Sequence, residues 1–199
     1  QGKVAYIEGE GFNGKGKRFK ALESKYNRTT RDVYLSEMPA FLSDPNNAEA
    51  VYSGICQACP DPALIVIDTL HRNFGDGDEN SAKDFSSFIF IITALVRQTG
   101  ATVLIVHHSG HGTSDRSRGS SAIRAAMDFE YKIEKSDSLV TMSCTKAKEF
   151  EEPPAVSFNL RPLPLLGWLD DEAKPVESAI LESTAYVPHI RKPVINGKD

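Results

Sequence analysis

Residues 63–69 read ALIVIDT, an unbroken apolar run that ends in a single carboxylate, Asp68. Five consecutive apolar residues without polar alternation are typical of a strand that is buried on both faces of a parallel sheet. Asp68 then lies at the carboxyl end of the strand, the edge at which open α/β sheets bind ligands. In nucleotide hydrolases an Asp at this place holds Mg²⁺, usually through water, beside the phosphates. A buried strand whose Asp only caps the next turn explains the heptapeptide equally well.

A second apolar strand follows in the chain, after the clearest helix. Apolar residues recur at steps of three and four over residues 85–96, and Gly100 is the expected helix stop. Residues 102–106 then read TVLIV and lead into two histidines, of which His108 is the second. Strand, helix and strand over residues 63–106 predict a parallel crossover unit, in which both strands end in polar residues at one edge.

The remaining elements are predicted from shorter patterns. Strands are expected at residues 4–7, 33–35, 129–134, 139–144 and 156–160, helices at 17–26 and from Asn46 or Asn47 to about 59, and loops at 8–16 and 70–80. The closely spaced strands after residue 129 predict an antiparallel extension of the sheet. These patterns predict an α/β domain over residues 1–162, with a mostly parallel sheet flanked by helices. Residues 163–199 are rich in Pro and charge, which predicts a C-terminal tail or linker.

Composition limits the class of protein. The 199 residues carry 23 basic and 27 acidic side chains, for a net charge of −4, so no global positive charge favours nucleic acid. The cysteines number only three, and no apolar run approaches the length of a membrane span. Cys56 and Cys59 form a lone CxxC, which lacks the ligand count for zinc. We therefore expect a soluble, cytoplasmic protein with no membrane partner.

A glycine-rich stretch near the N-terminus partly matches a phosphate-binding loop. Residues 9–15 read GEGFNGK, which fits GxxxxGK and follows a predicted strand. The match fails at the next position, because Walker A needs a Ser or Thr that reaches Mg²⁺ and Gly16 has no hydroxyl. Glu10 inside a phosphate cradle would also set a carboxylate against phosphate. The pattern therefore favours another role for this stretch.

Glu10 has a better use if its strand is adjacent to the strand of Asp68. Two carboxylates would then share one edge, with Asp68 for the metal and Glu10 to orient and deprotonate the attacking water. Gly9 and Gly11 allow close approach of a nucleotide, and Thr69 completes the predicted contacts with it. A glycine-rich turn with a solvated Glu is the simpler alternative.

Two further residues are candidates for contacts with a γ-phosphate. His108 ends the second strand and could donate a hydrogen bond to that phosphate, although a His at a strand end is usually an ordinary surface or core group. Arg118 lies in a Gly/Ser-rich loop and could act as an arginine finger toward a neighbouring subunit. A solvated loop arginine is the simpler alternative.

Together these residues resemble the RecA-like AAA_25 ATPases, phage and plasmid proteins similar to the hexameric RepA-type replicative helicases. The resemblance spans about residues 3–161 and rests on the segments YIEGEG (6–11), LIVIDT (64–69), GDENS (77–81), VHH (106–108) and RGSSAIRAAMD (118–128). It implies a RecA-like P-loop NTPase core in which Glu10 is the catalytic glutamate, Asp68 the Walker B residue and His108 the phosphate sensor. Arg118 would be the finger, and residues 109–117 would line a DNA channel.

The resemblance also implies ATP and Mg²⁺ as cofactors, a hexamer with ATP at its subunit interfaces, and single-stranded DNA as a partner. The family carries a Walker A motif before the strand at residues 4–7, so we expect an N-terminally truncated ATPase domain. The expected function is that of the ATPase domain of a phage, plasmid or prophage replicative DNA helicase. The alternatives are a non-catalytic oligomerising or DNA-binding module and a recombination or regulatory ATPase.

Overall fold

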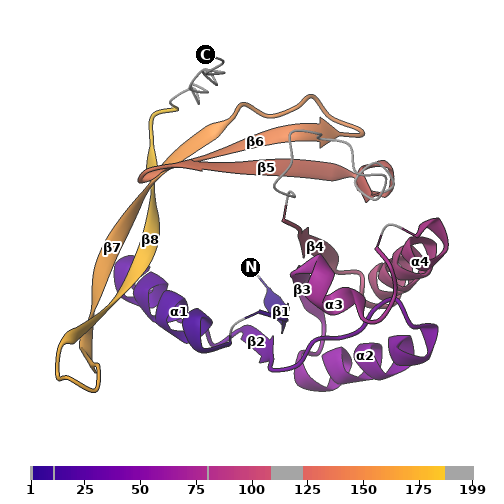
Figure 1. The fold of residues 1–199 in the computed structure, drawn as a ribbon, viewed down its shortest axis with the longest axis horizontal. Helices are drawn as coiled ribbons and strands as arrows, with labels where there is room; N and C mark the ends of the chain where they lie inside the picture. The colour runs from indigo at the N-terminus through magenta and orange to yellow at the C-terminus, as the bar shows by residue number, and fades with distance from the viewer. Residues whose placement is uncertain (1, 11, 80, 109–122, 187–199) are drawn as a thin grey trace, which may run out of the picture. The chain divides into compact units, whose positions relative to one another are not determined.

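The structure is a computed structural model, which describes residues 2–10, 12–79, 81–108 and 123–186. The chain divides into two compact units, residues 1–126 and residues 127–199, and each is described by itself (Figure 1). Unit 1 contains a parallel sheet with its helices, and unit 2 contains an antiparallel sheet. The predicted α/β class is therefore confirmed.

Among the described residues, four parallel strands form the sheet of unit 1 in the order β2-β1-β3-β4 (Figure 1). Their bounds are Lys3–Glu8 for β1, Val33–Ser36 for β2, Pro62–Asp68 for β3 and Thr102–Val106 for β4. The ALIVIDT stretch forms a central strand whose Ile65 and Ile67 are fully buried, as its apolar pattern predicts. The register sets Glu8 opposite Asp68 and Asp68 opposite Val106, so three strands end at one edge.

The sheet is accompanied by helices with the bounds Phe12–Tyr26 (α1), Pro45–Ala58 (α2), Leu70–Phe74 (α3) and Ala82–Thr99 (α4). Helix α4 matches its prediction at both ends. The side chain of Ser81 accepts a hydrogen bond from the backbone N–H of Asp84, and Gly100 ends the helix with a left-handed φ of 68°.

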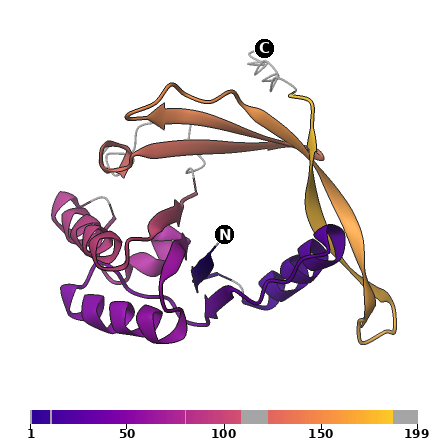
Figure 2. The ribbon, with the colours of Figure 1, turned by 180° about the vertical axis from the view of Figure 1, so that it is seen from behind.

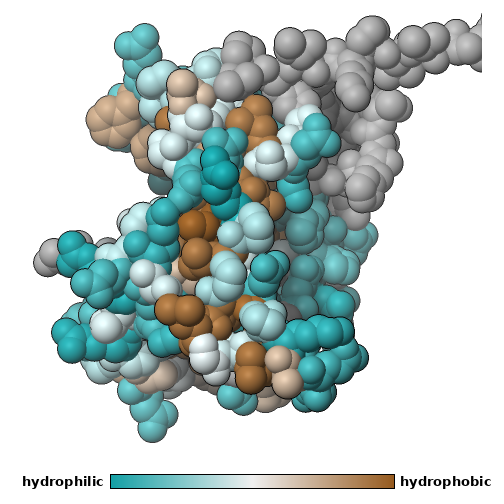
Figure 3. Space-filling model, turned by 90° about the vertical axis from the view of Figure 1, so that its left-hand side faces the viewer, coloured by the Kyte–Doolittle hydropathy of each residue, from teal (hydrophilic) through white to brown (hydrophobic). Residues whose placement is uncertain are grey.

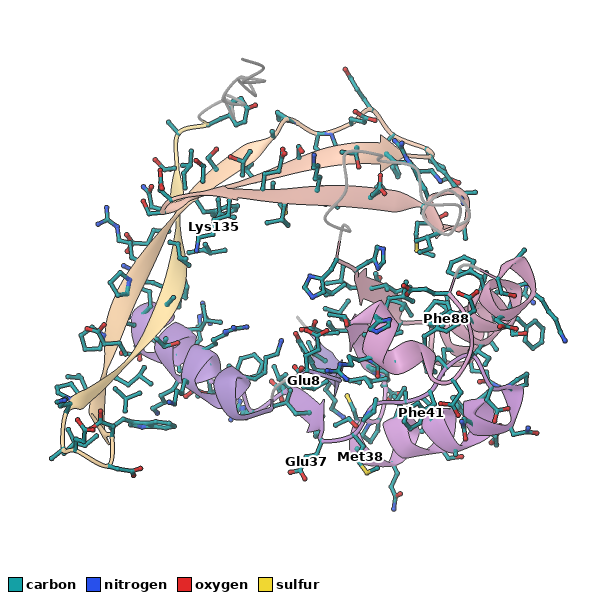
Figure 4. The ribbon with its side chains drawn as sticks, in the orientation of Figure 1. Glu8, Glu37, Met38, Phe41, Phe88 and Lys135 are labelled. Carbon is teal, nitrogen blue, oxygen red and sulfur yellow. The ribbon has the colours of Figure 1, made fainter. Side chains whose placement is uncertain are left out.

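The core of unit 1 joins buried side chains of β1, β3, α2, α3 and α4. The rings of Phe74 from α3 and of Phe85 and Phe88 from α4 stack on one another, with centroids 5.4 Å apart for Phe74 and Phe88 (Figure 4). This aromatic cluster holds the short helix α3 directly after β3. Thr69, between the two elements, is therefore placed by the core.

Two stretches predicted as loops contain helix. Helix α1 begins at Phe12, inside the glycine-rich stretch, and α3 occupies residues 70–74. Gly14 and Gly16 each destabilise a helix by about 1 kcal/mol relative to Ala. Tertiary contacts override this propensity, because Lys15 in the first turn of α1 forms ion pairs at the sheet edge.

The start of α2 also differs from the prediction. Asp44, not Asn46 or Asn47, caps the helix, and its side chain accepts a hydrogen bond from the backbone N–H of Asn46. Pro45 follows as the first helical residue, where its missing N–H is not needed.

Unit 2 is an antiparallel sheet with the strand order β5-β6-β7-β8 (Figure 2). The strands run Phe129–Ser136 (β5), Leu139–Ala147 (β6), Val156–Leu169 (β7) and Pro175–Thr184 (β8). The predicted antiparallel strands are therefore present. They pair with one another in a sheet of their own and do not extend the parallel sheet.

The expectation of a tail from residue 163 onward is wrong for residues 163–184, which form most of the β7–β8 hairpin. The prolines of this region are compatible with strand because β6 pairs only with residues 156–159 of β7. Pro162 and Pro164 pair with β8 alone, so one edge of β7 needs no donor there. The hairpin leaves Leu166 and Leu169 exposed, and Figure 3 shows hydrophobic side chains among hydrophilic ones on the face that includes it.

Candidate functional site

Polar residues from three strands meet at the carboxyl edge of the parallel sheet. Glu10 follows β1, Thr69 follows β3 and His108 follows β4. The backbone N–H of Gly9 donates a hydrogen bond of 2.7 Å to the carbonyl oxygen of Asp68, which ties the end of β1 to the end of β3. The structure therefore brings together the residues that the sequence analysis assigned to a shared site.

Glu10 contacts both of its neighbours at this edge. Thr69 Oγ1 donates a hydrogen bond of 2.9 Å to Glu10 Oε1, and His108 Nε2 lies 3.5 Å from Glu10 Oε2. The side chains of Glu10 and His108 are 39% and 72% exposed, so a ligand from solvent can reach both. One oxygen of Glu10 is thus oriented by Thr69, an arrangement that suits a carboxylate for accepting a proton from a bound water.

Asp68 lies deeper than Glu10, with only 9% of the residue exposed. Its Oδ2 accepts hydrogen bonds from the Tyr6 hydroxyl and from the Lys15 ammonium. Burial alone would raise the pKa of Asp68, but the hydrogen bonds from Lys15 and Tyr6 and the charge of Lys15 hold it below its usual value. Burial and the bond to Asp68 raise the pKa of Tyr6 to about 12. Near neutral pH Asp68 is therefore ionised and Tyr6 is a neutral donor.

The sequence analysis did not assign a role to Lys15, which the structure places inside the site. Lys15 Nζ lies 3.0 Å from Glu8 Oε2, donates a hydrogen bond of 2.8 Å to the Tyr6 hydroxyl and also binds Asp68. It lies 4.8 Å from the centroid of the Tyr6 ring. Burial would lower the pKa of Lys15, but its hydrogen bonds to Asp68, Tyr6 and Glu8 raise it above the ordinary value.

Glu8 is a second residue that the sequence analysis missed. It is 4% exposed, and its Oε1 accepts a hydrogen bond of 2.8 Å from the backbone N–H of Glu10. Figure 4 labels Glu8 among the side chains at this edge. A usable signal was present in the sequence, because Tyr6 and Glu8 are two positions apart on a strand and therefore share a face.

The donor set at this edge suits Mg²⁺, which prefers hard oxygen ligands and usually keeps several waters. The oxygens of Asp68, Glu8, Glu10 and Thr69 are of this kind, and the Lys15 ammonium already forms a cationic contact with Asp68 Oδ2. In the part of the chain that the structure describes, no three His, Cys, Asp or Glu side chains are grouped as a metal site. The oxygens therefore fit an ion that is held mainly through water, with Asp68 as the contact from the protein.

The remaining predicted site residues have different outcomes. Gly9 is tightly packed, because an added Cβ would lie 2.4 Å from the Cβ of Arg72 in α3. The structure thus gives Gly9 a packing reason that the sequence did not suggest. Gly11, Arg118 and the predicted DNA-channel loop at residues 109–117 lie outside the described residues.

Comparison with known proteins identifies relatives of this arrangement. A family model described as an AAA domain, AAA_25, matches residues 1–114. No curated protein sequence matches the chain. None of the described helices is both long and apolar enough to cross a membrane.

Solved structures show the same fold at low sequence identity. The crystal structure of the RadB recombinase superposes with a TM-score of 0.54 at 13% identity, covering 79% of this chain and 75% of that one. A second solved structure, the ATPase domain of a helicase, superposes with a TM-score of 0.55 at 12% identity, covering 79% of this chain and 71% of that one. Both are RecA-like, so the fold expected from the sequence is confirmed.

Proposed function

The chain belongs to the AAA_25 family of AAA domains, and we propose that it is the ATPase domain of a phage, plasmid or prophage replicative DNA helicase. The observation that carries the proposal is the meeting of Glu10, Asp68 and His108 at the carboxyl edge of one parallel sheet. This edge is where open α/β sheets bind their ligands. The likeness to the solved helicase ATPase domain supports a helicase at the level of the fold.

Each residue of the site has a part in the proposed hydrolysis. Bound at Asp68 through water, Mg²⁺ would supply charge that stabilises the transferring phosphoryl group. Glu10 accepts the proton of the attacking water, and Thr69 orients the carboxylate that does so. His108, exposed beside Glu10, donates a hydrogen bond to the γ-phosphate. Gly9, Gly11 and Thr69 form the nearby wall of the nucleotide site.

The proposal extends to the assembly. Subunits form a homo-oligomer, a hexamer in the proposed form, with ATP at their interfaces, and Arg118 reaches the γ-phosphate of the neighbouring subunit as an arginine finger. Residues 109–117 contact the single-stranded DNA along which the assembly translocates in the cytoplasm. Hydrolysis at the interface then moves this loop relative to the DNA.

Substitution of the proposed base tests the function. In the gene product that carries this chain, Glu10→Gln should lower the DNA-stimulated rate of ATP hydrolysis by about 100-fold or more, since a general base contributes that much. Glu49→Gln is the matched control, because Glu49 is an exposed residue on α2. Unchanged hydrolysis in Glu10→Gln overturns the enzyme assignment.

A recombination ATPase is the second candidate, which the likeness to the RadB recombinase favours at the level of the fold. It would use the same residues for hydrolysis, so ATPase measurements do not separate the two functions. A strand-displacement assay on a forked duplex does. ATP-dependent unwinding supports the helicase, and ATP-dependent strand exchange without unwinding supports the recombinase. A non-catalytic module would show neither activity and would leave ATP intact.

A further inference from the structure

Lys15 is the most highly engaged cation of the described site, although nothing in the proposed hydrolysis uses it. It reaches from the first turn of α1 to the ends of β1 and β3, where its Nζ contacts Asp68 Oδ2, Glu8 Oε2 and the Tyr6 hydroxyl. The Lys15 side chain is 14% exposed, and those of Glu8 and Asp68 are 3% and 13% exposed. An ammonium so enclosed is part of a built cluster and not a solvated surface charge.

The charges of this cluster explain why a cation is needed there. The register of β1 and β3 sets Glu8 directly opposite Asp68, so two carboxylates face one edge with little solvent between them and the protein. Like charges in a poorly solvated place disfavour ionisation of both groups. Lys15 supplies the compensating charge and keeps Asp68 ionised, consistent with the lowered pKa of Asp68 and the raised pKa of Lys15.

The oxygen that Lys15 binds is the oxygen that a divalent cation would need. Lys15 Nζ and a metal ion bound at Asp68 Oδ2 are both positive, and at a few ångströms they repel one another strongly in a partly buried site. We propose that Lys15 is a built-in counter-ion that occupies the metal position at Asp68 and is displaced when a divalent cation binds. This inference rests on the proposed metal site, and it adds a competing residue of the chain itself.

Displacement is structurally feasible because Lys15 lies near the end of a helix and carries a flexible four-carbon stem. The carboxylate of Glu8 and the Tyr6 hydroxyl stay in place on β1. Lys17 is a matched control on the same helix, two positions away and exposed. Replacement of either lysine by Met removes one positive charge and keeps a long apolar stem.

Mn²⁺ binding, measured by electron paramagnetic resonance as the loss of the free-ion signal, tests the competition without any nucleotide. Lys15→Met should bind Mn²⁺ roughly tenfold or more tightly than the unsubstituted chain, because the competing charge is gone. Lys17→Met should bind like the unsubstituted chain, and Asp68→Asn should abolish binding. Equal affinity of Lys15→Met and the unsubstituted chain, both lost in Asp68→Asn, overturns the role of Lys15 and keeps the metal site. Absence of Mn²⁺ binding in all variants overturns the metal site and the inference with it.

A measurement on the unsubstituted chain covers the case in which Lys15→Met does not fold. With lysines labelled at Cε and Nζ, the ammonium of Lys15 should give a slowly exchanging NMR signal that Lys15→Arg removes. Saturating Mg²⁺ should shift this signal toward those of exposed lysines. A Lys15 signal that stays unchanged while Mg²⁺ perturbs the Asp68 backbone resonance overturns the proposal.

Discussion

Thr69 Oγ1 donates a hydrogen bond of 2.9 Å to Glu10 Oε1, and this bond joins the end of β3 to the residues that follow β1. Thr69 is 1% exposed, whereas the Glu10 side chain is 39% exposed. A buried and well-packed hydroxyl thus orients a carboxylate that faces solvent. The exposed residue of the proposed hydrolysis depends for its position on a residue that the core holds.

Thr69→Val is expected to lower the kcat of ATP hydrolysis roughly tenfold and to change the KM for ATP little. Valine keeps the shape of threonine but lacks the hydroxyl, so the Glu10 carboxylate loses its fixed orientation while the nucleotide contacts persist. Thr69→Ser should restore most of the rate because it restores the donor. A Thr69→Val enzyme with unchanged kcat would show that the bond to Glu10 has no catalytic consequence.

Gly9→Ala is expected to destabilise the chain by about 1–3 kcal/mol, because the added methyl overpacks a closed contact. The new Cβ would lie 2.4 Å from the Cβ of Arg72. Gly54→Ala is the control, since nothing lies within 4 Å of its Cβ position and the site is inside α2. It should be neutral or stabilise the chain by up to about 1 kcal/mol. Urea unfolding measures both, and equal midpoints for the two variants would contradict the packing argument.

Tyr6→Phe is expected to reduce stability by about 1 kcal/mol, through loss of the hydrogen bond from its hydroxyl to Asp68. The same change should remove a late step in the absorbance of tyrosinate, because the pKa of Tyr6 is raised to about 12. Tyr186→Phe removes an exposed tyrosine and should leave that late step in place. A late step that persists in Tyr6→Phe would show that another tyrosine titrates there.

Acid is expected to weaken the chain through Asp68. The pKa of Asp68 is lower in the folded than in the unfolded chain, so the unfolded chain takes up this proton first as the pH falls. The stabilisation is therefore complete above about pH 4 and is lost as the pH falls through the folded pKa. The free energy of unfolding of Asp68→Asn should fall less steeply below about pH 4 than that of the unsubstituted chain. Parallel curves for the two proteins would exclude this contribution.

Much of the fold follows from local pattern. The apolar run before Asp68, the periodic segment that became α4 and the TVLIV strand predicted a parallel unit with its polar residues at one edge. Local pattern failed where glycine and proline dominate. The glycine-rich stretch enters α1, and the proline-rich stretch after residue 162 enters the β7–β8 hairpin. In both places contacts between distant residues outweigh a local preference of about 1 kcal/mol per residue.

The sequence by itself determined which chemical groups stand at the ends of the strands, because strand periodicity puts Asp68, Glu10 and His108 directly after apolar runs. Only the tertiary structure decided which of these groups touch, and it added Lys15 and Glu8 to them. The physical reason is that strand order and register are set by long-range pairing, as in Glu8 opposite Asp68 across a separation of 60 positions. An ammonium from α1 can meet those carboxylates only once the pairing has formed.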